Sequence, residues 1–142
     1  MLPKILLCVT IVSLSCNTPK KATTSANPLN GTWIPVKQEI GGSALAPASF
    51  AKQKLIINDS NYTLIAESVD KGAVVCKDDK MDIYGREGVN AGKHFTAIYK
   101  LENGQLSICY NLSGNSYPEA FETKGKPGFF LSIFQKEQKQ EK

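Results

Sequence analysis

The chain has 142 residues, of which 42% are hydrophobic and 21% carry a charge. A chain of this length suits one domain with a single hydrophobic core. The 17 basic and 13 acidic residues leave a net charge of +4. A surplus that small does not indicate a nucleic-acid-binding protein.

The first 15 residues have the layout of a secretory signal peptide. A basic start at Lys4 precedes an apolar run over residues 5–14, and the run ends in small residues. The apolar run covers about 10 residues, roughly half of the length that a membrane-spanning helix needs. We therefore predict that residues 1–15 direct export and are then removed.

The end of this segment resembles the lipobox of bacterial lipoproteins. Leu14 and Ser15 stand directly before Cys16, while Ser13 occupies a position where the motif usually has leucine. The resemblance implies that Cys16 carries acyl chains such as palmitate and anchors the protein to a membrane of the cell envelope. Asn17 stands where an acidic residue would favour the inner membrane, so the outer membrane, facing the periplasm, is favoured if the source has two membranes. The alternative is an ordinary signal peptide with an incidental cysteine.

Residues 16–28 are polar and contain no aromatic side chain. Such a segment buries too little apolar surface to offset the entropy lost on folding. We predict a flexible tether there, a folded domain over residues 29–136 and a charged tail over residues 137–142.

The domain shows the pattern of short strands separated by tight turns. Pro35 requires an edge or a bend in the first strand. Pro47 suits the start of the single helix candidate, residues 47–52. The predicted strands cover residues 32–40, 54–58, 61–66, 73–76, 80–84, 94–102, 105–112 and 129–135.

The strongest local signal is Asn103-Gly104, because this pair supplies the positive φ angles of a type I′ hairpin turn. The turn fixes the register of its two strands, so that one face carries apolar pairs and is predicted to be buried. The other face carries mostly polar pairs and is predicted to point outward. The apolar pairs are Leu101–Leu106, Tyr99–Ile108, Ala97–Tyr110 and Phe95–Leu112; the outward pairs are Lys100–Ser107, Ile98–Cys109 and Thr96–Asn111; and Glu102–Gln105 is the pair next to the turn.

Eight short strands without a long helix favour an all-β fold, namely an antiparallel up-and-down β-barrel of about eight strands. A β-sandwich is the alternative. Barrels of this size are either filled by their own side chains or have room for one small molecule.

Gly31-Thr32-Trp33 opens the first strand and resembles the G-x-W motif of lipocalins. The resemblance implies that Trp33 closes the base of the barrel and stacks on a basic residue near the last strand, for which Lys136 is the candidate. The chain also resembles a family of uncharacterised small lipocalin-like domains, common in planctomycetes and other bacteria. Residues 29–33, 92–99, 106–109 and 118–121 carry this resemblance. The chain departs from the family at Tyr117, where an arginine is usual, and no activity is attached to the family.

Two cysteines, Cys76 and Cys109, remain once Cys8 leaves with the signal peptide and Cys16 carries lipid. Neither belongs to a C-x-x-C motif, so a redox site or a zinc site is not indicated. Thiols commonly pair in an oxidising compartment. A Cys76–Cys109 disulfide and two separate thiols are both open alternatives.

No motif in the sequence indicates an enzyme, a metal site or a cofactor. His94 is the single histidine, and no nucleophile stands in a recognisable motif beside it. Asp78, Asp79 and Asp82 are interrupted by a lysine and lack the spacing of a calcium-binding loop.

Two kinds of function follow. In the first, the barrel binds a small apolar or amphipathic ligand; in the second, it has no cavity and contacts another envelope protein through loops such as residues 113–128. An aromatic-lined cavity would favour the first, and a filled core would favour the second. The candidate ligand-binding residues are Tyr62, Tyr84, Tyr99, Tyr110 and Phe130.

Overall fold

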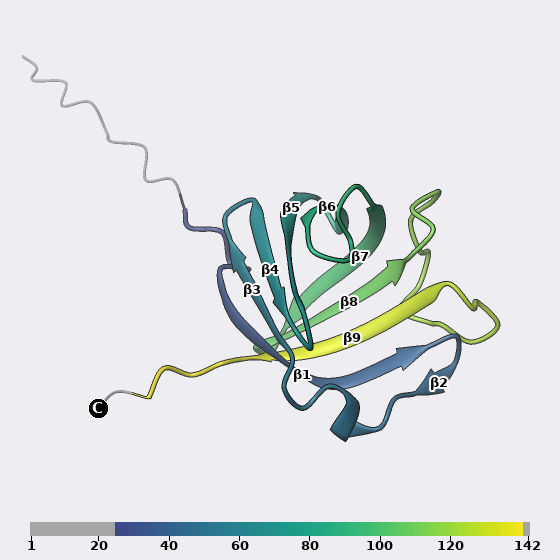
Figure 1. The fold of residues 1–142 in the computed structure, drawn as a ribbon, viewed down its shortest axis with the longest axis horizontal. Helices are drawn as coiled ribbons and strands as arrows, with labels where there is room; N and C mark the ends of the chain where they lie inside the picture. Colours follow the sequence, from purple (N-terminus) through teal and green to yellow (C-terminus); the bar gives the residue numbers. More distant parts are fainter. Residues whose placement is uncertain (1–24, 141–142) are drawn as a thin grey trace, which may run out of the picture.

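The computed structural model describes residues 25–140. Eight antiparallel strands form a closed barrel, in which successive strands pair and the last strand pairs with the first (Figure 1). The predicted up-and-down barrel is therefore confirmed, and the β-sandwich alternative is excluded. The barrel strands are β1 (Gly31–Ile40), β3 (Lys54–Asn58), β4 (Asn61–Ile65), β5 (Val69–Lys77), β6 (Lys80–Glu87), β7 (His94–Glu102), β8 (Gln105–Asn111) and β9 (Phe129–Lys136).

Two small elements lie outside the ring of strands. β2 (Ser43–Ala44) folds back on the end of β1, and a short 3-10 helix, η1 (Pro47–Ser49), leads towards β3. The helix predicted over residues 47–52 is thus only three residues long, although it begins with Pro47 as expected. None of the helices in the described part of the chain is long and apolar enough to cross a membrane. The predicted signal peptide, Cys16 and the tether as far as residue 24 lie outside the described residues.

β5 and β6 are longer than the sequence pattern predicts. β5 begins at Val69 rather than at residue 73, and β6 ends at Glu87 rather than at residue 84. The added parts meet at Gly72 and Gly85, which pair with each other beside a register shift. A Cβ atom at Gly72 would lie 2.0 Å from the backbone carbonyl oxygen of Tyr84 and 2.7 Å from the ring of Tyr62. Glycine is therefore needed at this position, and it interrupts the apolar alternation by which a strand is recognised.

The connections between strands differ at the two ends of the barrel. At one end, which we call the closed end, strands are joined by two-residue turns. Their first residues have positive φ, as tight hairpin turns require. At the other end, the open end, the connections are residues 41–53, 66–68, 88–93 and 112–128. The tight turns are Asp59-Ser60, Asp78-Asp79 and Asn103-Gly104, with φ of 54°, 56° and 50° at the first position.

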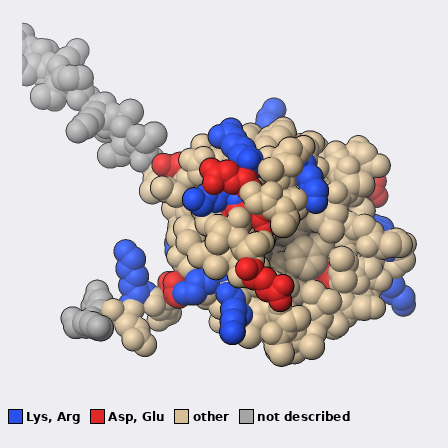
Figure 2. Space-filling view, viewed as in Figure 1, with Lys and Arg blue, Asp and Glu red and all other residues tan. Residues whose placement is uncertain are grey.

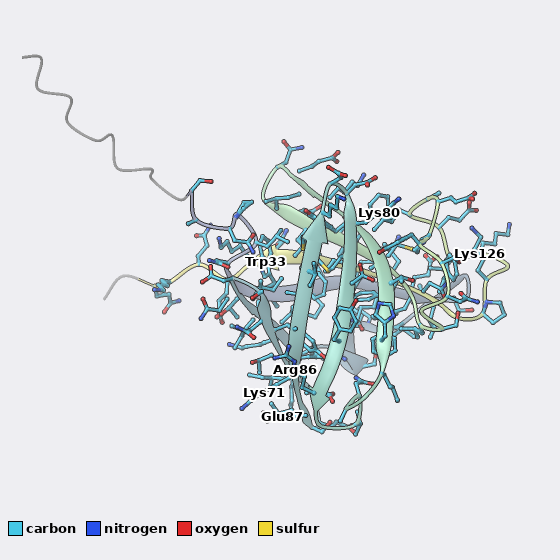
Figure 3. All side chains as sticks on the ribbon, turned by 90° about the horizontal axis from the view of Figure 1, so that it is seen from above. Trp33, Lys71, Lys80, Arg86, Glu87 and Lys126 are labelled. Atoms are coloured by element: carbon cyan, nitrogen blue, oxygen red, sulfur yellow. The ribbon has the colours of Figure 1, made fainter. Side chains whose placement is uncertain are left out.

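Trp33 fills the closed end, as the G-x-W resemblance implies. Its side chain is 1% exposed, and its indole N–H donates to the carbonyl oxygen of Leu29 at 2.8 Å. Lys136 is its partner in the β1–β9 ladder, and the lysine Nζ lies 5.4 Å from the indole ring centroid. Gly31 has a φ of 135°, and a Cβ atom there would lie 2.6 Å from Cε of Lys136. Glycine at this position thus leaves room for the lysine side chain to reach the ring. Trp33 is labelled in Figure 3.

The register predicted from Asn103-Gly104 is confirmed over seven residue pairs of β7 and β8. The eighth predicted pair, Phe95–Leu112, is not formed. Leu112 instead donates its backbone N–H to the carbonyl oxygen of Gly128 at 2.9 Å and leaves the ladder. The polar loop that follows β8 therefore begins one residue earlier than the apolar pattern suggests.

The outward face of β7 and β8 is covered by another segment of the chain and is not exposed to solvent. Residues 112–128 fold back across it, and Thr123 in this segment is fully buried, donating its hydroxyl to Glu39 and accepting the backbone N–H of Gly42 at 2.9 Å. We call the apolar layer beneath the segment the outer-wall core. It consists of Ile98, Cys109 and Leu131 with Tyr117, Phe121 and Phe129 packed against them.

Replacing Trp33 by alanine is expected to lower the free energy of unfolding by about 3–5 kcal/mol, the usual cost of removing a buried tryptophan. Replacing Lys136 by alanine removes a cation–π contact and is expected to cost about 0.5–1 kcal/mol. Urea denaturation followed by circular dichroism measures both changes. Because Trp33 is the single tryptophan, its native emission should also be blue-shifted and resist quenching by acrylamide. A readily quenched Trp33, or a Lys136→Ala effect as large as that of Trp33→Ala, would contradict this account of the closed end.

Candidate ligand-binding cavity

The interior of the barrel is only partly filled, and a cavity of about 510 Å³ lies within it. Figure 2 shows the molecular surface hollowed on the face turned to the viewer. The lining is mostly aliphatic and aromatic, with four polar residues contributed from the open end. The aliphatic residues are Leu55, Ile57, Leu64, Val74, Met81, Ile83, Ile108 and Leu112; the aromatic ones are Tyr62, Phe95, Tyr110, Phe130 and Phe134; the polar ones are Gln38, Gln53, Asn90 and Lys93.

Strand alternation explains both the lining and the empty space. Successive residues of a strand point to opposite faces of the sheet, so Ile108 and Tyr110 of β8 share the inward face. Several inward positions carry small residues instead of large ones. Ala97 pairs with Tyr110, and Ser132 pairs with Ile108, and both small residues are fully buried. Together with Gly72, these small residues leave the space that larger side chains would fill.

Three of the five predicted ligand-binding residues line the cavity, namely Tyr62, Tyr110 and Phe130. The rings of Tyr110 and Phe130 stack with their centroids 5.6 Å apart. Tyr84 does not line the cavity; it points outward and is 42% exposed, because its neighbour Ile83 takes the inward position. Tyr99 packs against the interior core but lies outside the cavity lining, near the closed end, where it donates its hydroxyl to the carbonyl oxygen of Asp78 at 3.0 Å.

The hydroxyl groups of Tyr62 and Tyr110 are the polar groups within the apolar part of the cavity. Burial raises the pKa of both hydroxyls; nearby Asp70 adds to the rise at Tyr62, and nearby Tyr62 adds to the rise at Tyr110. Both groups are therefore protonated at neutral pH and able to donate a hydrogen bond.

The polar residues at the open end were not predicted from the sequence. Gln38 donates its side-chain amide to Oε1 of Gln53 at 2.8 Å and to Oγ of Ser132 at 3.3 Å. Asn90 and Lys93 belong to the loop of residues 88–93, which connects β6 to β7. These side chains lie at strand ends or in a loop, where neither alternation nor a turn motif gives their direction.

The loop of residues 88–93 is held in a defined position. The buried carboxylate of Asp70 accepts the backbone N–H of Asn90 at 3.0 Å. The backbone of Gly85 bonds to the last two residues of the loop, donating to the carbonyl oxygen of Lys93 and accepting from the backbone N–H of Gly92, each at 2.9 Å. This bonding places the side chains of Asn90 and Lys93 at the cavity.

A second polar cluster lies on the outer wall, away from the cavity. The carboxylate of Asp82 lies 2.7 Å from Nε2 of His94 and accepts the hydroxyl of Tyr117 at 2.6 Å. The imidazole of His94 also stacks on Tyr84, with ring centroids 4.6 Å apart. Tyr117 belongs to the segment that covers the outer-wall core, so the cluster fastens this segment to β6 and β7. Among residues 25–140 no group of three or more histidine, cysteine or acidic side chains is arranged to hold a metal ion.

The two cysteines of the domain are separate thiols. Cys76 packs against the interior core, whereas Cys109 belongs to the outer-wall core. They therefore lie on opposite faces of the barrel wall, and of the two alternatives left open by the sequence, the disulfide is not formed. Burial raises the pKa of both thiols, which makes them poor nucleophiles at neutral pH.

Comparison of the chain with models of known protein families, with curated proteins and with solved structures finds no match. The chemistry of the cavity and the features of the sequence therefore carry the functional argument.

Acid is expected to loosen the segment that covers the outer wall. Burial acts to raise the pKa of Asp82, but hydrogen bonds from Tyr117 and His94 outweigh it and lower the pKa. A carboxyl group whose pKa is lowered by folding stabilises the protein above its unfolded pKa of about 3.9. That contribution is lost as the pH falls through the folded pKa.

The measurement compares the melting temperature of the wild type and of Asp82→Asn between pH 7 and pH 3. The variant should be less stable at pH 7 and should lose less stability on acidification, since it lacks this titrating group. Glu122→Gln, at an exposed position on the same segment, is the control, and its melting temperature should fall with pH as much as that of the wild type. An equal fall in the melting temperatures of the wild type and Asp82→Asn would show that ionisation of Asp82 does not stabilise the fold.

Proposed function

We propose that this protein is an envelope lipoprotein, anchored through Cys16, whose barrel binds a small apolar or amphipathic molecule. The observation that carries the binding proposal is the cavity of about 510 Å³. Small-molecule sites usually measure about 300–1,000 Å³ and combine an apolar lining with a few polar groups. The burial of Trp33 beneath Lys136 also supports the resemblance of the fold to lipocalin-like domains.

The arrangement of the loop of residues 113–128 favours this proposal over an interaction lipoprotein without a ligand. Its two aromatic side chains, Tyr117 and Phe121, pack against the outer-wall core. A loop that gripped a partner protein would instead present such anchors to solvent. The proposal assigns no catalytic step to the domain, since His94 is bonded to Asp82 on the outer wall and does not line the cavity.

Binding is tested with N-phenyl-1-naphthylamine, a neutral apolar probe whose fluorescence rises in apolar surroundings. Leu64 lines the cavity and is half-buried, so Leu64→Trp should fill part of the space without unfolding the barrel. We expect this variant to bind the probe at least about tenfold more weakly, a loss of about 1.4 kcal/mol. Leu101→Trp is the matched control, because Leu101 is 38% exposed and does not line the cavity.

The control should bind the probe like the wild type, and both variants should keep the far-ultraviolet circular dichroism of the native barrel. Native mass spectrometry of protein purified without refolding from a bacterial host should also reveal a co-purified small molecule. A wild-type protein that does not bind the probe, or a Leu64→Trp variant that binds it equally well, would rule out the cavity as a binding site.

The anchor is tested separately by replacing Cys16 with alanine in a bacterial host. We expect the protein to move from the membrane fraction to the soluble fraction, because lipid attached to this cysteine would supply the membrane affinity. Cys8→Ala is the control and should leave the protein in the membrane, since Cys8 lies within the segment expected to be removed. A Cys16→Ala protein that stays in the membrane with its signal peptide removed would disprove lipidation at this residue.

A further inference from the structure

The charged groups around the cavity are distributed unequally. Lys93 is the one charged side chain among the residues that line it, and no carboxylate does so. Lys71, Arg86 and Glu87, on the strands nearest the loop of residues 88–93, are exposed on the outside of the barrel, where they are labelled in Figure 3. The lining therefore has a single positive charge and no negative charge to balance it.

The ammonium group of Lys93 is not used by the fold. Its Nζ has one contact, with Oδ1 of Asn90 at 3.4 Å. Among residues 25–140 the ion pairs are formed by other basic side chains, and no carboxylate lies within 4.0 Å of Nζ of Lys93. Asp70 is the acidic residue that bonds to the loop of residues 88–93. Its carboxylate accepts a backbone N–H of this loop and thereby positions Lys93 without neutralising its charge.

The cavity is polar at its mouth and apolar beyond it. Gln38, Gln53, Asn90 and Lys93 lie at the open end, whereas Met81, Phe134 and Ile108 lie towards Trp33. A molecule that matches this arrangement has a charged or polar head and an apolar tail. A bare hydrocarbon would make no use of the positive charge of Lys93 at the mouth, and a wholly polar molecule would leave the apolar wall without contacts.

The volume limits the tail to one chain. A methylene group is about the size of a water molecule, which occupies roughly 30 Å³ in the liquid. A cavity of about 510 Å³ then corresponds to about 17 such groups. This is the size of one ordinary acyl chain, and a lipid with two such chains would exceed it.

Resting on the proposed ligand-binding function, we propose that the ligand is a single-chain amphiphile with an anionic headgroup. Nζ of Lys93 binds the carboxylate or phosphate at the open end, and the tail extends towards Trp33. Lys93 is exposed at the mouth, and a charge-assisted hydrogen bond from its Nζ favours the anion over a neutral head of the same size. The lysine acts as a point charge on a flexible stem, so it accommodates either kind of anionic head.

The test is competition against N-phenyl-1-naphthylamine by three ligands that share one chain: tetradecanoate, tetradecan-1-ol and the lysophosphatidate carrying a tetradecanoyl group. We expect tetradecanoate to bind at least about tenfold more tightly than the alcohol at neutral pH and low salt. The ratio of their dissociation constants should fall at high salt, since screening weakens the charge interaction. Comparison of tetradecanoate with the lysophosphatidate then identifies which anionic head the mouth prefers.

Lys93→Met keeps the apolar stem and removes the charge, so it should reduce the acid-to-alcohol ratio to about one. The same variant should bind the neutral probe within about twofold of the wild type, which shows that it is folded. Lys77→Met is the matched control, because Lys77 is an exposed residue at the closed end with the same charge. It should retain the full ratio.

The two proposals fail in different ways. If the wild type binds the probe but prefers the alcohol or binds both ligands equally, the anionic headgroup is disproved and the ligand-binding function stands. The same holds if Lys93→Met retains the preference for the acid. If neither the probe nor any of the three ligands binds to the wild type, the ligand-binding function itself is disproved.

Discussion

The burial of Trp33 at the meeting point of the first and last strands is the contact on which the closed barrel depends. β1 pairs with β3 only through residues 31–33 and with β9 from Trp33 onward, so this residue lies where the two ladders meet. Its ring occupies the closed end, its indole N–H is bonded to Leu29, and Lys136 covers it from outside. With one end closed in this way, the unfilled space in the barrel opens only towards the longer connections.

The hairpins could be predicted from the sequence because their determinants are local. Asn103-Gly104 set a register that holds over seven residue pairs, and the tight turns gave most strand ends correctly. The prediction failed where a residue serves a distant contact. Gly72 is required by the backbone carbonyl of Tyr84 and by the ring of Tyr62, on the two neighbouring strands, and this glycine obscures the apolar pattern over the first four residues of β5.

The candidate site was predicted less completely than the fold. Alternation identified Tyr62, Tyr110 and Phe130, but it cannot give the absolute direction of a strand whose two faces both carry apolar or aromatic residues. Ile83 and Tyr84 of β6 illustrate this, because an alternation of inward and outward residues is satisfied whether Ile83 or Tyr84 is the one that points inward. The state of the interior was also beyond local reasoning, because a cavity results from the summed volumes of inward side chains on all eight strands.

The chain enters and leaves the barrel at the same end. Near the start of the domain, Asn27 donates its side-chain amide to the carbonyl oxygen of Asp59, in a closed-end turn, at 2.9 Å. Just after the last strand, Glu137 donates its backbone N–H to the carbonyl oxygen of Thr32 at 2.8 Å. The proposed anchor at Cys16 would therefore join the barrel at its closed end, through the segment ahead of Asn27. A nine-residue strand is about 30 Å long and barrel strands tilt by about 40°, so the cavity mouth would lie about 23 Å beyond the closed end. Such an orientation suits a protein that exchanges its cargo with the surrounding aqueous space or with a facing carrier, rather than one that extracts molecules from the bilayer beneath it.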